Sequence, residues 1–228
     1  MKKTKVDYSG FRLSRLREPR FSHLLLLLGW PVYLLLFALT ERLIPAERCT
    51  PVHCPLDDLI PFCEWFLIPY VFWYALIVLS LGYFLRYDVE SFRRLQTFFI
   101  LVQTAAMVCY LLFPTRQDLR PAVFPRENLL TAGVSLLYRV DTNTGVCPSL
   151  HVACSLGIAS VWLRKRDALP SQRIFVAVSA VLICLSTVFL KQHSVVDGLA
   201  ALPVCLLAEG LLSAGRFRRA VRLRHPAA

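Results

Sequence analysis

Long stretches without charged residues constrain the fold of this chain more than any other feature. Five such runs contain no Lys, Arg, Asp or Glu, and a sixth contains only Asp197 and Glu209. Each is close to the ~20 apolar residues that an α-helix needs to cross the hydrocarbon core of a bilayer. The runs comprise residues 21–40, 65–85, 95–115, 142–163, 174–190 and 194–214. We therefore expect an all-α integral membrane protein built as a bundle of six transmembrane helices.

Basic residues predict the domain plan and the orientation of these helices. The net charge is +11, and the charges separate the apolar runs instead of forming one patch. This pattern is typical of contact with anionic lipid, and we expect no nucleic-acid partner. We predict one catalytic membrane domain, 21–214, between a basic segment, 1–20, and a basic tail, 215–228. With both termini cytoplasmic, 19 of the 26 Lys and Arg residues lie on the cytoplasmic side, as the positive-inside rule requires.

Two details of the runs predict local structure. Pro31 lies inside the first run, where a membrane helix tolerates it with a kink. No convincing cleavage site follows that run, so we expect a retained anchor and not a signal peptide. Trp65, Tyr70 and Trp73 near one end of the second run are typical of an interfacial aromatic belt.

A histidine and an aspartate at the junction of the last two runs indicate chemistry. His193 and Asp197 are four residues apart, a spacing that puts two side chains on one face of a helix. A carboxylate there can accept the Nδ1 proton and leave Nε2 free as a nucleophile or base. The alternative is a structural polar cluster between helices. Because ionisable groups are costly within a membrane, we favour catalysis.

The second polar stretch is Cys147-Pro148-Ser149-Leu150-His151. Pro148 suits the first position of a helix, and the free backbone N–H groups after it can hold an anion. His151 then lies in the first turn, where it can donate a proton to a leaving oxygen. The predicted topology puts both histidines on one side of the membrane. Together they predict a membrane-embedded phosphoryl-transfer site.

Arginines follow the third run in a segment where the positive-inside rule depletes them. Residues 116–141 contain Arg116, Arg120, Arg126 and Arg139. Since guanidinium groups bind phosphate through planar, bidentate contacts, a function is favoured over ordinary surface charge. We expect Arg120 and Arg116 to bind phosphate.

Residues 41–64 contain cysteines and carboxylates that leave alternatives open. Two of Cys49, Cys54 and Cys63 could form a disulfide on an oxidising side of the membrane. Their spacing matches no closed zinc site. Asp57 and Asp58 have no third carboxylate at ligand spacing, so we expect a solvated loop or partners for basic residues such as Lys191. We expect no metal and no cofactor.

These stretches together resemble the type 2 phosphatidic acid phosphatase superfamily, also called the lipid phosphate phosphatases. The likeness is closer to its branch of inositol phosphorylceramide and sphingomyelin synthases. The first family motif is Lys, six residues, then Arg-Pro; Arg120-Pro121 matches, but Phe113 replaces the Lys, and Arg116 is the candidate substitute. The second is Pro-Ser-Gly-His, here with Leu150 for Gly.

The third family motif is Ser-Arg, five residues, His, three residues, Asp. Ser186, His193 and Asp197 match it, and Thr187 replaces the Arg. The resemblance implies a lipid-phosphatase-like bundle and a phospho-histidine mechanism that requires no metal. His193 is then the nucleophile, Asp197 holds its tautomer, and His151 is the general acid and base. The phosphate oxygens are stabilised by a set of four residues, namely Arg120, Arg116, Lys191 and Ser149.

Three functions stay open from the sequence. A lipid phosphate phosphatase uses water as the acceptor, and we favour it slightly. A lipid phosphotransferase uses a lipid or inositol-type hydroxyl instead. The third alternative is a non-catalytic membrane subunit that binds lipid. In all three we expect a multi-pass protein of the cell membrane, and an active site would face the extracytoplasmic or lumenal side.

Overall fold

The computed structural model describes the chain from residue 5 to residue 224 and its side chains from residue 5 to residue 214. Part of the predicted segments 1–20 and 215–228 therefore lies outside the described residues. The regular structure of the described chain is helical apart from one two-stranded sheet. In chain order its elements are η1 Leu13–Arg15, η2 Ser22–Leu28, α1 Gly29–Leu43, η3 Ala46–Arg48, β1 Thr50–Pro51, α2 Pro55–Leu59, η4 Glu64–Phe66, α3 Leu67–Tyr87, α4 Val89–Leu112, β2 Thr115–Arg116, α5 Leu129–Val140, α6 Leu150–Arg164, α7 Pro170–Phe189 and α8 Val195–Arg224.

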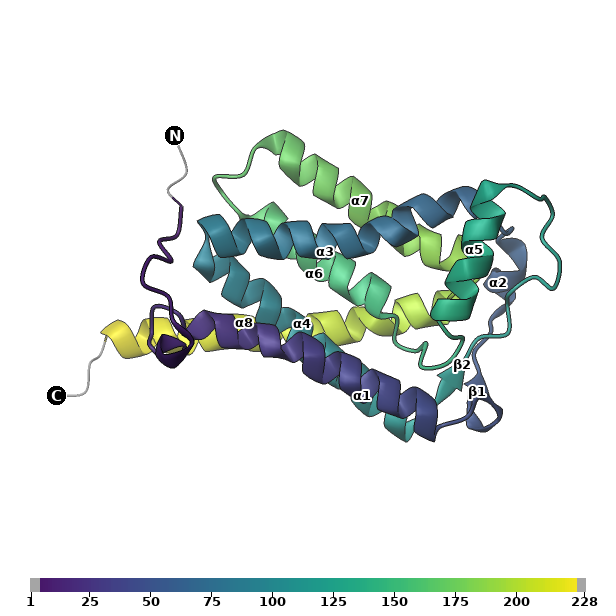
Figure 1. The fold of residues 1–228 in the computed structure, drawn as a ribbon, viewed down its shortest axis with the longest axis horizontal. Helices are drawn as coiled ribbons and strands as arrows, with labels where there is room; N and C mark the ends of the chain where they lie inside the picture. The colour runs from purple at the N-terminus through teal and green to yellow at the C-terminus, as the bar shows by residue number, and fades with distance from the viewer. Residues whose placement is uncertain (1–4, 225–228) are drawn as a thin grey trace.

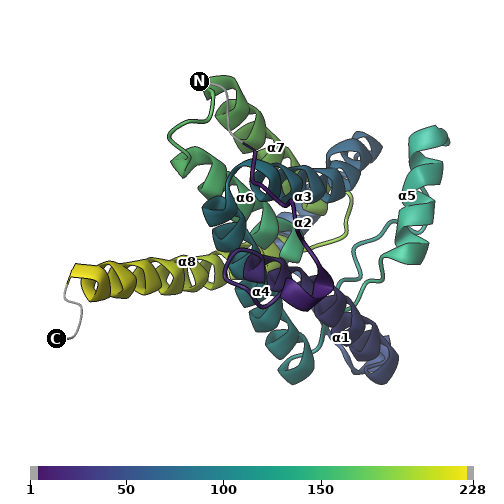
Figure 2. The ribbon, with the colours of Figure 1, turned by 60° about the vertical axis from the view of Figure 1, so that its left-hand side comes forward.

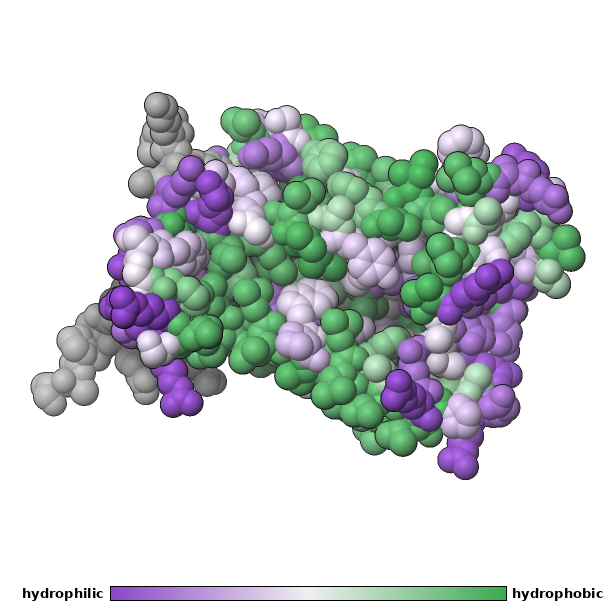
Figure 3. All heavy atoms as spheres, viewed as in Figure 1, coloured by the Kyte–Doolittle hydropathy of each residue, from purple (hydrophilic) through white to green (hydrophobic). Residues whose placement is uncertain are grey.

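Five helical segments are long and apolar enough to cross a membrane. They are Ser22–Leu43, Glu64–Tyr87, Val89–Leu112, Pro170–Phe189 and Val195–Ala214. Large apolar side chains such as Leu35, Leu79 and Leu206 lie exposed on their outer faces. Figure 3 shows an apolar band between two hydrophilic ends. Such a surface is more stable in lipid than in water. The expectation of an all-α chain is confirmed, with five candidate membrane-spanning helices where six were predicted.

The predicted fourth span, 142–163, differs from the others. Its helix, α6, has 15 residues, which is about 22 Å long against a hydrocarbon core of about 30 Å. Residues 142–149 form a loop instead. In this loop Val146, Pro148 and Ser149 are buried and Thr142 is exposed. Helix α6 itself packs against α3, α4, α7 and α8. Among the described residues, a short central helix therefore takes the place of the sixth long span.

The six longer helices α1, α3, α4, α6, α7 and α8 run alternately between two ends of the molecule (Figures 1 and 2). One end contains α2, α5 and the small sheet, and we call it the α5 end. The opposite end contains the α3–α4 and α6–α7 connections and the segment before η2. That segment is attached to the last turn of α3, because the Val6 amide donates to the Arg86 carbonyl at 2.8 Å.

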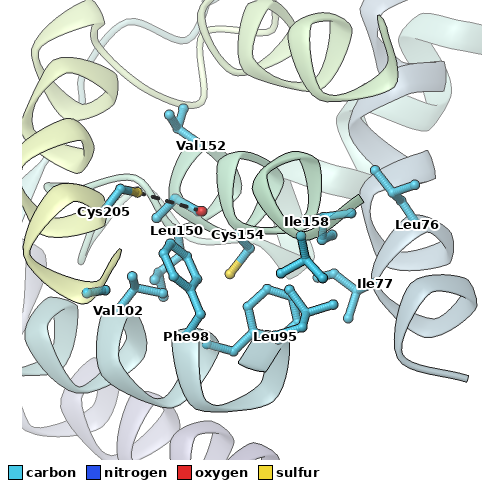
Figure 4. Packing of buried hydrophobic residues seen from close by; sticks show 14 of the residues in the cluster. Leu76, Ile77, Leu95, Phe98, Val102, Leu150, Val152, Cys154, Ile158 and Cys205 are labelled. Atoms are coloured by element: carbon cyan, nitrogen blue, oxygen red, sulfur yellow. Dashed lines mark hydrogen bonds between the residues drawn. The ribbon is translucent and has the colours of Figure 1, made fainter. Parts of the chain in front are cut away.

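Aromatic side chains of α4 fill the centre of the bundle. Phe98 and Phe99 are buried, and Phe98 lies against Gly157 of α6. A Cβ on Gly157 would come within 2.4 Å of the Phe98 ring. The glycine therefore permits the close approach of α4 and α6. Figure 4 shows this packing, with Cys154 and Ile158 of α6 beside Phe98.

The segments at the α5 end hold one another in place. β1 and β2 pair in parallel, with Thr50 opposite Thr115. Helix α5 was not expected from the sequence, and Asn128 caps it by accepting a hydrogen bond from the Thr131 amide at 2.9 Å. The three loop cysteines are unpaired thiols, so the open choice of a disulfide is not realised in this structure.

The first span begins as a 3₁₀ helix. Residues Ser22–Leu28 form η2, and α1 starts at Gly29, two residues before Pro31. Proline has no N–H to donate and clashes with the carbonyl four residues earlier in an α-helix. The change of helix type just before Pro31 avoids both conflicts, so the proline marks a helix transition.

Candidate active site

His193 and Asp197 contact each other across the start of α8. Nδ1 of His193 lies 3.1 Å from Oδ2 of Asp197. His193 precedes the helix, which starts at Val195, so the expected shared helical face is wrong. The contact forms because Oδ2 of Asp197 also accepts the Ser194 amide at 3.0 Å and closes a turn. Since Nδ1 faces the carboxylate, Nε2 is the ring nitrogen left for chemistry.

His151 lies in the first turn of α6, as the sequence predicts, but Pro148 is not the first helical residue. Ser149 is the N-cap, and its Oγ accepts the Val152 amide at 3.4 Å. The Ser149 amide donates to the Asp197 carbonyl at 3.0 Å. This bond joins the starts of α6 and α8. It brings together two stretches that are more than 40 residues apart in the sequence.

The two imidazoles face a common space. Their ring centroids are 5.8 Å apart, with the planes inclined by 60°. The His151 ring stacks on Tyr70 at 4.3 Å and lies 4.2 Å from the Trp73 ring. Its Nε2 atom is buried and has no hydrogen-bond partner among the described residues. A buried ring nitrogen without a partner is unusual, and a substrate oxygen that reached it would supply the missing hydrogen bond.

Both histidines line a cavity of about 710 Å³. At the histidine end the walls are polar and include Asp141, Thr142 and Gln192. Further along, the walls are apolar and come from α1, α3 and α4. No Lys or Arg of the described part of the chain lines this cavity. The histidines are therefore its only potential cations among the described residues.

A hydrogen-bonded network supports the histidine end. Oδ2 of Asp141 accepts the Tyr70 hydroxyl at 2.5 Å and Nε2 of Gln192 at 3.2 Å. Arg120 donates to Oε1 of Gln192 at 2.6 and 3.0 Å, and to the carbonyls of Tyr138 and Asp141. Burial lowers the pKa of the Arg120 guanidinium, and nearby Tyr138 and Asp141 oppose this shift. Arg120 is thus one side chain removed from the cavity.

Sequence reasoning missed four residues around the histidines. Tyr70 and Trp73 were interpreted as an interfacial belt, but both are buried beside His151, and only Trp65 is exposed. Gln192 adjoins His193, and Asp141 precedes the loop that leads to α6. Their positions next to the motifs are the only signal that could have indicated them.

The other predicted phosphate ligands have different partners. Arg116 pairs with Asp118 at 3.0 Å and donates to the Ala46 carbonyl at 2.7 Å. Nζ of Lys191 donates to the carbonyls of Asp57 and Ile60 at 2.7 and 2.5 Å. Burial lowers the pKa of Lys191, against the attraction of nearby carboxylates. Neither side chain lines the cavity, and Ser149 is buried behind it.

Asp57 fixes the start of α8 from outside the site. Its carboxylate accepts the Ser194 hydroxyl at 2.6 Å and the backbone amides of Val195 and Cys54 at 2.8 Å each. Burial raises the pKa of Asp57, but the hydrogen bonds from Ser194, Val195 and Cys54 outweigh it and leave the pKa below its usual value. The sequence prediction of a solvated loop is therefore wrong for Asp57. Asp58 is exposed but also lies in helix α2. The alternative expectation is met in part, because Lys191 binds the backbone carbonyl of Asp57.

Comparison with known proteins gives one partial match. The chain is 38% identical over 77 residues to a PA-phosphatase related-family protein of Dictyostelium discoideum. The match covers 32% of this chain and 13% of that protein, so the chain spans a small part of its relative's length. No family model matches the chain, and no solved structure matches it. The similarity points to a lipid-phosphatase-like family at low coverage.

Proposed function

We propose that the protein is a membrane lipid phosphate phosphatase that acts through a phospho-histidine. The observation that supports this best is the pair of imidazoles 5.8 Å apart at the polar end of a largely apolar cavity. In the first step Nε2 of His193 attacks phosphorus. A nitrogen–phosphorus bond forms, and the bond to the ester oxygen breaks. Asp197 holds the Nδ1 proton, so that Nε2 carries the lone pair.

His151 is the general acid and then the general base of the proposal. Protonated at Nε2, it gives its proton to the departing oxygen. In the second step it takes a proton from water, which attacks phosphorus and releases His193. Its buried, unpartnered Nε2 suits an exchange with substrate oxygens.

In this proposal the negative charge on the phosphate oxygens is stabilised mainly by groups that do not contact them. Arg120 acts through Gln192, whose amide lines the cavity, and the starts of α6 and α8 supply positive dipole ends. In this proposal Arg116, Lys191 and Ser149 shape the site instead of binding phosphate directly, because their side chains have other partners.

A second candidate is transfer of a phosphorylated head group to a lipid or inositol-type hydroxyl. It shares the phospho-histidine and differs in the acceptor. One observation favours it: the cavity contains the Asp141 carboxylate and, among the described residues, no Lys or Arg. A phosphate monoester at neutral pH carries more negative charge than a phosphodiester. The diester therefore fits a site with few cations better.

A direct experiment separates these functions. Purified protein in detergent is offered phosphatidic acid, a polyprenyl diphosphate, or phosphatidylinositol with ceramide. Phosphate release indicates the phosphatase, and a new phospholipid indicates the transferase. His193→Ala should abolish the activity and the acid-labile, alkali-stable phosphoryl label. The matched control His53→Ala changes an exposed loop histidine and should retain both. Full activity in His193→Ala would rule out the mechanism.

We also propose that the site faces the extracytoplasmic or lumenal side. The end of α3, the start of α4 and the end of α6 lie at the end of the bundle opposite to the site (Figure 1). These segments contain Arg86, Arg93, Arg94 and Arg164. Under the positive-inside rule that end is cytoplasmic. A thiol placed at exposed Val123 should react with a membrane-impermeant reagent in intact cells if this orientation holds.

A further inference from the structure

The apolar part of the cavity has a shape that the phosphoryl chemistry does not explain. Helices α1 and α3 both pack on α4, and a gap remains between them. We call this gap the α1–α3 groove. Its walls include Leu34 of α1, and Val78, Leu81 and Leu85 of α3, with Phe92 of α4 at its far end. In Figure 3 the surface between α1 and α3 is recessed.

The groove extends deep into the apolar band. It follows α3 from Tyr70, which stacks on His151, to Leu85. These 15 steps of 1.5 Å correspond to about 22 Å, more than half of the ~30 Å hydrocarbon core. A molecule that fills it would have one end at the histidines and the other near the opposite end of the bundle.

The width of the groove limits what can occupy it. A volume of about 710 Å³ spread over about 22 Å gives a mean cross-section of about 32 Å². An α-helix with side chains is 10–12 Å wide, so its cross-section is roughly 80 Å² or more. A helix of another protein or of a second copy fits this cross-section less well. An extended hydrocarbon chain is thin enough.

We propose that the α1–α3 groove binds one hydrocarbon chain of the lipid substrate and that Gly82 sets the chain length it accepts. This inference rests on the proposed function for the position of the phosphate. The head group then lies among His193, Asp141 and Gln192, and the chain extends along α3. Polar walls at one end and apolar walls at the other match the two parts of such a lipid.

Gly82 leaves space near the end of the α1–α3 groove that is far from the histidines. It lines the groove on α3, and a Cβ built on it meets no described heavy atom within 4 Å. A larger side chain there would project into the groove without a clash. Because glycine is a poor helix former, Gly82→Leu should also leave α3 intact. The bundle offers a matched control: Gly210 of α8 has equally open surroundings and is exposed outside the groove.

The first test is chain-length selectivity. Activity is measured on dioctanoyl, dimyristoyl and dioleoyl phosphatidic acid for the natural protein, Gly82→Leu and Gly210→Leu. The kcat/KM ratio of the longest to the shortest substrate should fall about tenfold in Gly82→Leu, the loss expected when about two methylene groups leave the groove. Gly210→Leu should keep the natural ratio. An unchanged ratio in Gly82→Leu would overturn the proposal.

The second test does not require activity. Phosphatidic acid with a diazirine at the end of one acyl chain is crosslinked to His193→Ala protein, and the adducts are mapped by mass spectrometry. We expect adducts on 81–85 and Phe92, and loss of most of them when Gly82→Leu is added. Adducts mainly on outward-facing residues such as Leu206 and Leu207 would refute the groove. If crosslinking succeeds while no phosphatase activity is found, the groove stands and the proposed function fails.

Discussion

Replacing Asp57 by alanine should destabilise the protein from a position outside the cavity. The carboxylate accepts three hydrogen bonds, from the Ser194 hydroxyl and the Val195 and Cys54 amides. Two of these donors lie at the start of α8, directly beside His193. Asp57 is also buried, so water cannot easily replace it. The truncation therefore leaves buried donors without acceptors.

The size of the effect follows from these contacts. Loss of a capping acceptor at a helix start costs about 1 kcal/mol. A buried donor left unsatisfied costs about 1–3 kcal/mol. Because the bonds share one carboxylate, these terms do not add fully, and we expect about 3 kcal/mol for Asp57→Ala. For a chain of this size that corresponds to a fall in Tm of roughly 6–12 °C.

Thermal unfolding in detergent, followed with a thiol-reactive dye, measures this effect because buried Cys154 and Cys205 react only after unfolding. Asp58→Ala is the matched control. Its carboxylate is exposed and contacts His53 at 2.9 Å, a surface pair worth about 0–1 kcal/mol. A Tm of Asp57→Ala that stays as close to the natural protein as that of Asp58→Ala would show that Asp57 does not anchor α8.

Other predictions follow from the same contacts. The folded-state pKa of Asp57 lies below its unfolded value. The stability that its carboxylate adds is therefore fully present above about pH 4 and is lost as the pH falls through the folded pKa. The Tm difference between the natural protein and Asp57→Asn should shrink in acid. Tyr70→Phe removes a hydroxyl that donates to Asp141 and should lower kcat about tenfold while Tm falls by only a few degrees. An unchanged kcat would show that the Tyr70 hydroxyl does not contribute to catalysis. Gly157→Val forces a side chain against Phe98 and should cost about 1–3 kcal/mol of unfolding free energy, which denaturant titration can measure.

The helical spans could be predicted because charge-free runs report lipid contact directly. The predicted run 65–85 became α3 at Leu67–Tyr87, within two residues at each end. The run 95–115 became Val89–Leu112, because Asp88 caps the helix seven residues before Leu95, where the charge-free run begins. Charged residues at a helix start are invisible to an apolar-run criterion. The amphipathic helix α5 was missed for a different reason: it has 12 residues, fewer than the ~20 that the criterion for a span requires.

The partners of polar side chains could not be predicted. The spacing of His193 and Asp197 indicated their contact. In the sequence, Arg116 and Lys191 look like phosphate ligands because they are positively charged, but in the structure they bind backbone carbonyls. Tyr70 at a span end has the same sequence signature whether it faces lipid or a neighbouring helix. These choices depend on how helices rotate about their axes, which residue type alone does not determine.

The unequal lengths of α6 and α7 show how the chain brings His193 back to His151. From His151 the chain crosses through α6, with 15 residues, and returns through α7, with 20, so α7 is longer by about 7 Å. Lys191 has a left-handed φ of 56° and reverses the chain at that point. The amides of Gln192 and His193 then both donate to the Thr187 carbonyl at 3.0 Å, which brings His193 back along α7 towards His151. A left-handed non-glycine residue costs about 1–2 kcal/mol, and the two hydrogen bonds of the Lys191 ammonium to α2 and its C-terminal flank offset that cost. Lys191→Gly should relieve the backbone strain but remove the hydrogen bonds that hold α2. Because these two effects on stability oppose each other, a normal Tm with a reduced kcat would show that Lys191 positions His193.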